Sequence, residues 1–128
     1  MEFQKIGDYL KNVRTNSLET FPNQECPQKT VIKRIENNEN YMIKSLFAYA
    51  NVLKQQLYYK DNLINNSCDL GNIIRDTVKE QNMTITELGE KADLKRKTIY
   101  MLMSGHGNYF SFVKVLKILN VDINIRKK

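Results

Sequence analysis

The chain has 128 residues, a length that predicts one domain or two very small ones. Its 20 basic and 14 acidic residues give a net charge of +6, which favours polyanionic partners without identifying one. No apolar run of about twenty residues could span a membrane, and the charged first residues lack the apolar core of a signal peptide, so we expect a cytoplasmic protein with no membrane partner.

Cysteine and histidine are too scarce for most metal sites and catalytic triads. Cys26 and Cys68 lie far apart in the sequence, and we interpret them as two reduced thiols. His106 is the only histidine. The sequence shows no nucleophile–base pair, no metal-ligand cluster and no phosphate-binding loop, so we expect neither an enzyme nor a resident metal or cofactor.

Apolar residues at helical spacing predict three helices in the first half of the chain. The first covers about residues 3–15, the second starts at Pro27, which suits a first helical turn, and the third follows the polar loop 36–40. Between the first two, Ser17 could cap another helix, but Pro22 would interrupt it after one turn. The inward-facing residues are Ile6, Tyr9, Leu10 and Val13, then Val31, Ile32 and Ile35, then Ile43, Leu46, Phe47, Ala50 and Leu53.

A short strand and a repetition of the helical pattern follow. Alternation at residues 56–59 predicts the strand, and residues 62–67 form the only linker-like stretch. A helix with Leu70, Ile73, Ile74, Thr77 and Val78 comes next, then two short helices over residues 84–104, then a helix with Tyr109, Phe112, Val113, Leu116 and Leu119. Val121, Ile123 and Ile125 alternate with polar residues and predict a last strand.

The two halves align as copies of one domain, at a nearly constant offset in residue number. In the first helix Gly71 takes the place of Gly7. Further along, Ile99 takes the place of Ile32, and Leu119 takes the place of Leu53. We prefer duplication to a chance likeness of helical segments, with one domain over residues 1–61 and the other over 66–128. The first copy is slightly shorter, at Pro22–Pro27, so we expect its second helix to be shortened or absent.

Residues 84–104 carry the most specific pattern. Thr84 and Glu87 have the spacing of a capping box at a helix start. Gly89 is small enough for two helix backbones to approach closely, and Asp93 stands where the chain must turn. On the helix that follows, Lys95, Arg96, Lys97 and Tyr100 remain on the solvent side, and Met101 and Met103 flank the buried face as partial core filler. Two short helices, a tight turn and a basic leading end predict a helix-turn-helix.

These residues resemble the phage-repressor and Cro type of helix-turn-helix domain, which also occurs in many small bacterial antitoxins. The match runs from residue 70 to about 123, with two departures: Asp93 where glycine is commoner, and residues 101–103 where the family often has Arg-Ile-Glu. It rests on Leu70, Gly71, Thr84, Leu88, Gly89, Asp93, Leu94, Thr98, Ile99, Leu102, Gly105 and Leu116 to Leu119. In the first half, residues 31–37 and Ile6-Gly7 read similarly. The resemblance implies an all-α fold of two tandem repressor-like domains with four or five helices each, every domain ending in a short strand, and the first copy degenerate.

The docking known for this family implies that the helix at about residues 95–104 enters the major groove of double-stranded DNA. Arg96 would contact guanine, while Lys95 and Lys97 would neutralise phosphates. The full implied set is Thr84, Lys95, Arg96, Lys97, Tyr100, Met101, Ser104, His106 and Asn108. A second DNA-binding head would use Gln28, Lys29, Thr30, Lys33 and Arg34. Arg34 is equally well placed to pair with Glu36 or Glu39.

The leading hypothesis is a sequence-specific transcriptional regulator, a repressor of bacterial or phage/plasmid type that associates with the nucleoid. The alternative is an antitoxin that binds a toxin protein and controls its own operon. The strands at residues 55–60 and 121–127 need partners, because isolated short strands are unstable. They would pair antiparallel within one chain, or with another chain to form a homodimer, and the sequence leaves both arrangements open.

Overall fold

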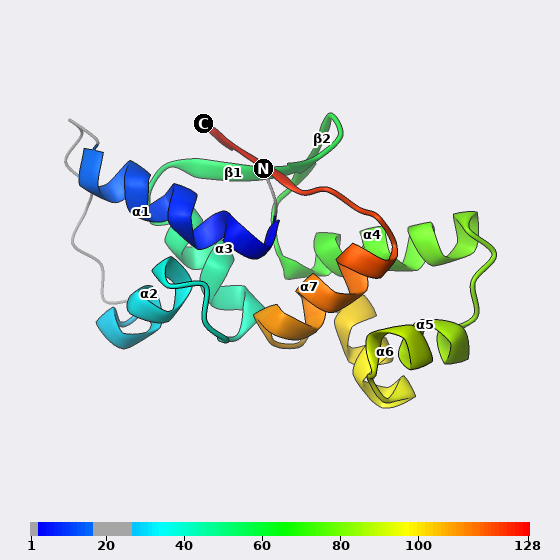
Figure 1. Cartoon of the computed structure of the whole chain (residues 1–128). Helices are drawn as coiled ribbons and strands as arrows, with labels where there is room; N and C mark the ends of the chain where they lie inside the picture. Colours follow the sequence, from blue (N-terminus) through cyan, green and yellow to red (C-terminus); the bar gives the residue numbers. More distant parts are fainter. Residues whose placement is uncertain (1–2, 17–26) are drawn as a thin grey trace.

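The computed structural model describes residues 3–16 and 27–128, which form a mostly helical protein with one small sheet (Figure 1). After a 3-10 turn at Phe3–Lys5, the helices are α1 (Ile6–Asn16), α2 (Lys29–Glu36), α3 (Ile43–Val52), α4 (Ser67–Glu80), α5 (Ile85–Ala92), α6 (Arg96–Met103) and α7 (Tyr109–Ile118). The strands are β1 (Gln55–Tyr59), β2 (Asn62–Ile64) and β3 (Asn124–Lys127). The expected class, helical with short strands, is confirmed at this level.

Helix α2 begins at Lys29, slightly later than the sequence predicted. Gln28 is its N-cap and has an extended backbone (φ −66°, ψ 157°), so Pro27 precedes the helix and is not part of its first turn. The predictions for Ser17, Pro22 and Cys26, and for a shortened second helix in this segment, concern residues outside the described ranges.

The three strands form one antiparallel sheet in the order β2-β1-β3. Leu57 of β1 pairs with Ile64 of β2 on one side and with Ile125 of β3 on the other. The predicted linker at residues 62–67 is wrong, because the chain turns back along β1 to form β2, and Ser67 already begins α4. Strands β1 and β3 pair within the chain, which is one of the two arrangements that the sequence left open.

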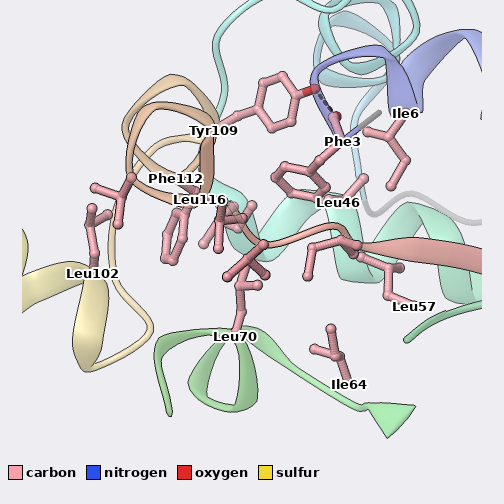
Figure 2. Packing of buried hydrophobic residues seen from close by; sticks show 14 of the residues in the cluster. Phe3, Ile6, Leu46, Leu57, Ile64, Leu70, Leu102, Tyr109, Phe112 and Leu116 are labelled. Carbon is pink, nitrogen blue, oxygen red and sulfur yellow. Dashed lines mark hydrogen bonds between the residues drawn. The ribbon is translucent and has the colours of Figure 1, made fainter. Parts of the chain in front are cut away.

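One continuous apolar core joins the two halves of the chain (Figure 2). Leu46 and Leu57 come from the first half, and Leu70, Phe112 and Leu116 come from the second; each is at most 1% exposed. Burying a side chain of this size contributes about 1.5–3 kcal/mol relative to leaving it in water. The shared core therefore holds the helices of both halves in fixed positions relative to the sheet.

Tyr109 anchors the start of the chain to this core. Its ring stacks on Tyr41 at 4.8 Å and lies tilted against Phe3 at 5.3 Å. Its hydroxyl donates a hydrogen bond to the carbonyl of Phe3 (Figure 2). Burial raises the pKa of both tyrosines above the ordinary value. The hydroxyl of Tyr41 is buried and has no hydrogen-bond partner among residues 3–16 and 27–128.

Two of the helices in each half have a counterpart of equal length in the other half, whereas α1 has 11 residues and α4 has 14. α2 and α6 have eight residues each, and α3 and α7 have ten residues each. α1 packs on α2, and α4 packs on α6. A Cβ on Gly7 would lie 1.9 Å from the carbonyl oxygen of Ile35, and a Cβ on Gly71 would lie 2.6 Å from that of Leu102. In both halves a glycine thus lets one helix, α1 or α4, approach the backbone at the last turn of another, α2 or α6.

One contact between the two halves is exchanged when each residue is replaced by its counterpart. Met42 and Asn108, which have the same offset in residue number as Leu53 and Leu119, form an isolated antiparallel bridge. Its hydrogen bonds run from Ile43 N to Gly107 O (3.0 Å) and from Tyr109 N to Tyr41 O (2.7 Å). In the sheet, the pair Tyr58–Asn124 has this same offset, but the other β1–β3 pairs have no counterpart across it. The bridge therefore has a local, approximate two-fold symmetry, which the sheet shares at the Tyr58–Asn124 pair alone.

Candidate nucleic-acid interface

Helix α5 begins with the expected capping box. The Thr84 hydroxyl oxygen accepts a hydrogen bond from the Glu87 amide at 3.0 Å, and a Glu87 carboxylate oxygen accepts from the Thr84 amide at 3.4 Å. The Thr84 hydroxyl also donates to that carboxylate at 3.2 Å. These bonds fix the start of α5, because they satisfy amides that the first helical turn leaves unpaired.

The turn between α5 and α6 has the conformation that the sequence predicted. Asp93 ends α5 in the left-handed region, with φ 54° and ψ 48°. The Leu94 amide donates to the Gly89 carbonyl at 2.9 Å, and a Cβ on Gly89 would lie 2.8 Å from the Leu94 carbonyl oxygen. The small residue and the tolerant aspartate together set the angle between the two helices.

Helix α6 has an apolar face that is buried and a basic N-terminal end that is exposed. Ile99 and Leu102 are fully buried, while Tyr100 and Met101 are 50% and 45% exposed. We call the exposed set Lys95, Arg96, Lys97, Tyr100 and Met101 the second reading face. Met103 belongs to the core at 6% exposure, so of the two methionines that we expected beside the buried face, only this one fills the core.

The loop after α6 holds the other three candidates in different settings. Ser104 is exposed and its hydroxyl donates to the Tyr100 carbonyl at 3.2 Å. His106 is exposed, with its amide bonded to the Met101 carbonyl at 2.9 Å. Asn108 is half-buried, caps α7 by accepting from the Ser111 amide at 2.9 Å, and lies at the bridge between the halves. Asn108 therefore belongs to the bridge and not to the α6 surface.

Helix α2 presents the corresponding surface in the first half. We call the exposed set Gln28, Lys29, Thr30, Lys33 and Arg34 the first reading face. At the offset that relates Ile32 to Ile99, these positions correspond in order to Lys95, Arg96, Lys97, Tyr100 and Met101. Within the described residues Arg34 makes no ion pair with Glu36 or Glu39, so that alternative is not what the structure shows.

Glu36 is bound instead by an arginine that the sequence did not single out. Arg14 of α1 donates to both carboxylate oxygens, at 2.6 Å and 2.8 Å, and the Tyr49 hydroxyl donates to one of them. Burial alone would raise the pKa of Glu36, but the hydrogen bonds from Arg14 and Tyr49 outweigh it and hold that pKa below its usual value. The bonded carboxylate in turn raises the pKa of Arg14.

The second half has an apolar cluster where the first half has this polar one. At the offsets of the aligned helices, Arg14, Glu36 and Tyr49 correspond to Val78, Met103 and Val115. All three of these apolar residues are buried. No local pattern marked the polar cluster, because its three residues come from three helices, with Arg14 lying 22 positions and Tyr49 lying 13 positions from Glu36.

The two reading faces are basic and their charges are unneutralised. Among the residues that the structure describes, none of Lys29, Lys33, Arg34, Lys95, Arg96 and Lys97 forms an ion pair. Residues 94–121 contain five basic residues and no acidic one. The N-caps of α2, α3 and α6 make no side-chain capping hydrogen bond, whereas Asn66, Thr84 and Asn108 cap α4, α5 and α7. Free helix amides and unpaired cations both favour an anion.

Both reading faces belong to helices on the side of the molecule away from the sheet. Figure 1 shows β1, β2 and β3 along one side, and α2 and α6 toward the opposite side, with the first turns of α3 and α7 meeting between them. Met42 and Phe110, beside this meeting point, are 60% and 45% exposed. The structure thus brings the predicted residues of the two halves to one side, in two separate groups.

Comparison of the chain with protein-family models, with curated proteins and with solved structures gives no match. None of the helices in residues 3–16 and 27–128 combines the length and the apolar character needed to cross a membrane.

Proposed function

We propose that this protein is a sequence-specific regulator of transcription that binds double-stranded DNA, of the repressor type found in bacteria, phages and plasmids. It acts by occupying a promoter and not by catalysis. We include in this proposal the resemblance to the phage-repressor and Cro family, and the interpretation of the chain as two tandem domains of that type, the first one degenerate.

The observation that carries the proposal is the second reading face on a rigid two-helix unit. The capping box at Thr84 and the left-handed turn at Asp93 fix α5 and α6, and the buried Ile99 and Leu102 fix the rotation of α6. A helix held in this way can present its first residues to the edges of bases in the major groove. Arg96 has the planar pair of donors that fits guanine.

The other exposed residues suit the phosphate backbone. Lys95 and Lys97 flank Arg96 and add affinity that depends on salt, because each phosphate contact releases counterions. The exposed Ser104 and His106 lie directly after α6, where their polar groups would contact phosphate or sugar. Asn108 lies at the bridge with its side-chain oxygen capping α7, so we leave it out of the proposed contacts. The equal lengths of α2 and α6 and of α3 and α7, together with the exchanged contacts at the bridge, support the duplication.

The test is to select bound sequences from random DNA and to measure affinity for the preferred one. Arg96→Ala should weaken binding to that sequence by about 5- to 150-fold, the equivalent of roughly 1–3 kcal/mol, while reducing non-specific affinity much less. Arg75→Ala is the matched control, because Arg75 is an exposed arginine on α4. In a competition assay, unlabelled random DNA should displace the labelled selected sequence much less effectively than the unlabelled selected sequence does. If the two competitors are equally effective, the proposal of specific reading is wrong.

An antitoxin is the second candidate, and the open edges of the sheet favour it. β2 and β3 are the outer strands of the order β2-β1-β3, and Leu63 on β2 is 39% exposed. A toxin could add a strand to such an edge. Copurification of a small protein encoded next to this one, abolished when Leu63 is replaced by lysine, would support this function. Retention of that partner by the Leu63→Lys variant would place the contact elsewhere.

A further inference from the structure

We propose that one copy of this chain reads two unlike half-sites, with α6 in one major groove and α2 in the other. The preferred DNA is then a bipartite sequence that is not a palindrome. This inference rests on the proposed function, and it adds that the first reading face contacts bases and that no second copy is required.

The approximate two-fold relation at the bridge lies within one chain. An operator with two equivalent half-sites normally matches two protein subunits related by a two-fold axis. Here the bridge pairs Met42 with Asn108, and the sheet pairs Tyr58 with Asn124. The difference in residue number within these pairs is also the difference between α3 and α7. The difference between α2 and α6 is larger by one residue. A single chain therefore has the arrangement that a dimer usually supplies.

The two heads are held rigidly relative to each other. Two heads on a flexible linker would accept many spacings between half-sites. These heads share one apolar core, and β1 pairs with β3 over the register from Gln55–Lys127 to Tyr58–Asn124. The spacing of the half-sites should accordingly be fixed, at about one turn of the double helix, since α2 and α6 both lie on the side of the molecule away from the sheet (Figure 1).

The first reading face is as positively charged as the second. α2 exposes Lys29, Lys33 and Arg34, three cations, as α6 and its N-cap do. Glu36 is the acidic residue of α2, and it is buried and neutralised by Arg14. The Arg14–Glu36 pair thus stabilises the first half without placing a negative charge on the first reading face.

The two faces differ at every position. Corresponding positions are Gln28 and Lys95, Lys29 and Arg96, Thr30 and Lys97, Lys33 and Tyr100, and Arg34 and Met101. No pair is identical. The arginine suited to guanine is near the start of α6 and more than one helical turn further along on α2, so the guanine preferences of the half-sites should fall at different places.

The main experiment compares the sites selected by the natural chain with those selected by a variant whose first reading face copies the second. That variant carries Gln28→Lys, Lys29→Arg, Thr30→Lys, Lys33→Tyr and Arg34→Met, all at exposed positions. The natural chain should select a bipartite, non-palindromic site and bind it as one chain per duplex by native mass spectrometry. The variant should select a palindrome that repeats the half-site read by α6.

A second variant removes the first reading face and keeps the rest. Lys29→Ala/Lys33→Ala/Arg34→Ala should shorten the hydroxyl-radical footprint to the α6 half-site. It should also reduce the slope of log affinity against log salt by about one for each phosphate that α2 no longer neutralises. The control is Lys5→Ala/Lys11→Ala/Lys79→Ala, which removes three positive charges from exposed lysines outside both faces, and circular dichroism melting verifies that each variant is folded.

The outcomes separate this inference from the proposed function. A single short half-site, bound by one chain and unaffected by changes in α2, overturns the inference and leaves a DNA-binding regulator. A palindrome bound by two copies of the natural chain overturns it in the same way. Binding with no sequence preference at all overturns both.

Discussion

Replacing Glu36 alone should destabilise the protein strongly, whereas replacing its whole cluster should not. In Glu36→Met the two hydrogen bonds from Arg14 and the one from Tyr49 disappear. In the triple variant Arg14→Val/Glu36→Met/Tyr49→Phe, the first half receives at the first two positions the residues that the second half has there, and Phe keeps the ring volume of the buried Tyr49. The contrast follows from a general asymmetry: a buried polar group left without its partner is costly, while exchange of all partners for apolar groups can be neutral.

The expected magnitude follows from the exposure of each group. Breaking a fully buried ion pair costs about 3–5 kcal/mol. The Arg14 side chain is 45% exposed and returns to water, which lowers the cost of losing the pair to about 2 kcal/mol. The Tyr49 hydroxyl loses its acceptor, at about 1 kcal/mol. We expect Glu36→Met to lose about 3 kcal/mol, or roughly 10 °C in Tm, and the triple variant to lie within about 1 kcal/mol of the natural chain.

The assay is urea unfolding at pH 7, followed by far-ultraviolet circular dichroism. Glu39→Met is the control, because Glu39 is an exposed glutamate close to Glu36 in the sequence and should change the unfolding free energy by less than about 0.5 kcal/mol. A Glu36→Met variant as stable as the natural chain would refute the expected role of the cluster. A triple variant as unstable as the single one would refute it equally, since an apolar cluster could then not replace the polar one.

Three further predictions concern stability. Because the folded-state pKa of Glu36 is lowered, its stabilising contribution is complete above the unfolded pKa of about 4.3 and is lost as pH falls through the folded value. The deficit of Glu36→Gln in urea unfolding should therefore shrink between pH 6 and pH 3, and a constant deficit would contradict this. Asp93→Gly should raise stability by about 1 kcal/mol, since φ is 54° at Asp93; a lower Tm would show that the aspartate side chain matters more than its backbone strain. Tyr41→Phe should stabilise the fold by about 1 kcal/mol, because the hydroxyl of Tyr41 is buried and lacks a partner among the described residues. Tyr109→Phe should destabilise the fold by a similar amount, because it loses the hydrogen bond to Phe3. If both substitutions change the unfolding free energy in the same direction, this pair of predictions is wrong.

The features that the sequence predicted well are local ones. The capping box at Thr84, the left-handed turn at Asp93 and the burial of Val121, Ile123 and Ile125 all depend on residues a few positions apart. The strand predicted from that alternation begins later than expected, at Asn124, so Val121 and Ile123 precede it. Spacing of this kind records helix caps, turns and buried faces directly. The second reading face followed from the same local pattern, because a helix with a buried stripe leaves its other residues exposed.

The features that were missed depend on distant residues or on weak patterns. Arg14 is far from Glu36 in the sequence, and the local alternative was that Arg34 pairs with Glu36 or Glu39, but Arg34 lies on the exposed part of α2. β2 has three residues, too few for alternation to distinguish it from a linker; its identity depends on pairing with β1. The position of Asn108 at the bridge depends on how the two halves meet, which no local pattern records.

The two-fold relation within one chain also changes what a mutation can do. In a dimer of identical chains, a residue at the two-fold axis meets its own copy, and every substitution occurs twice. Here Tyr58 meets Asn124, and Arg126 lies over the Tyr58 ring at 4.9 Å, while its counterpart Lys60 lies over Tyr59. One side can therefore gain an interaction, lose one or change its specificity while the other stays as it was. Natural selection can act on each half separately, with both still held in a fixed ratio of one to one.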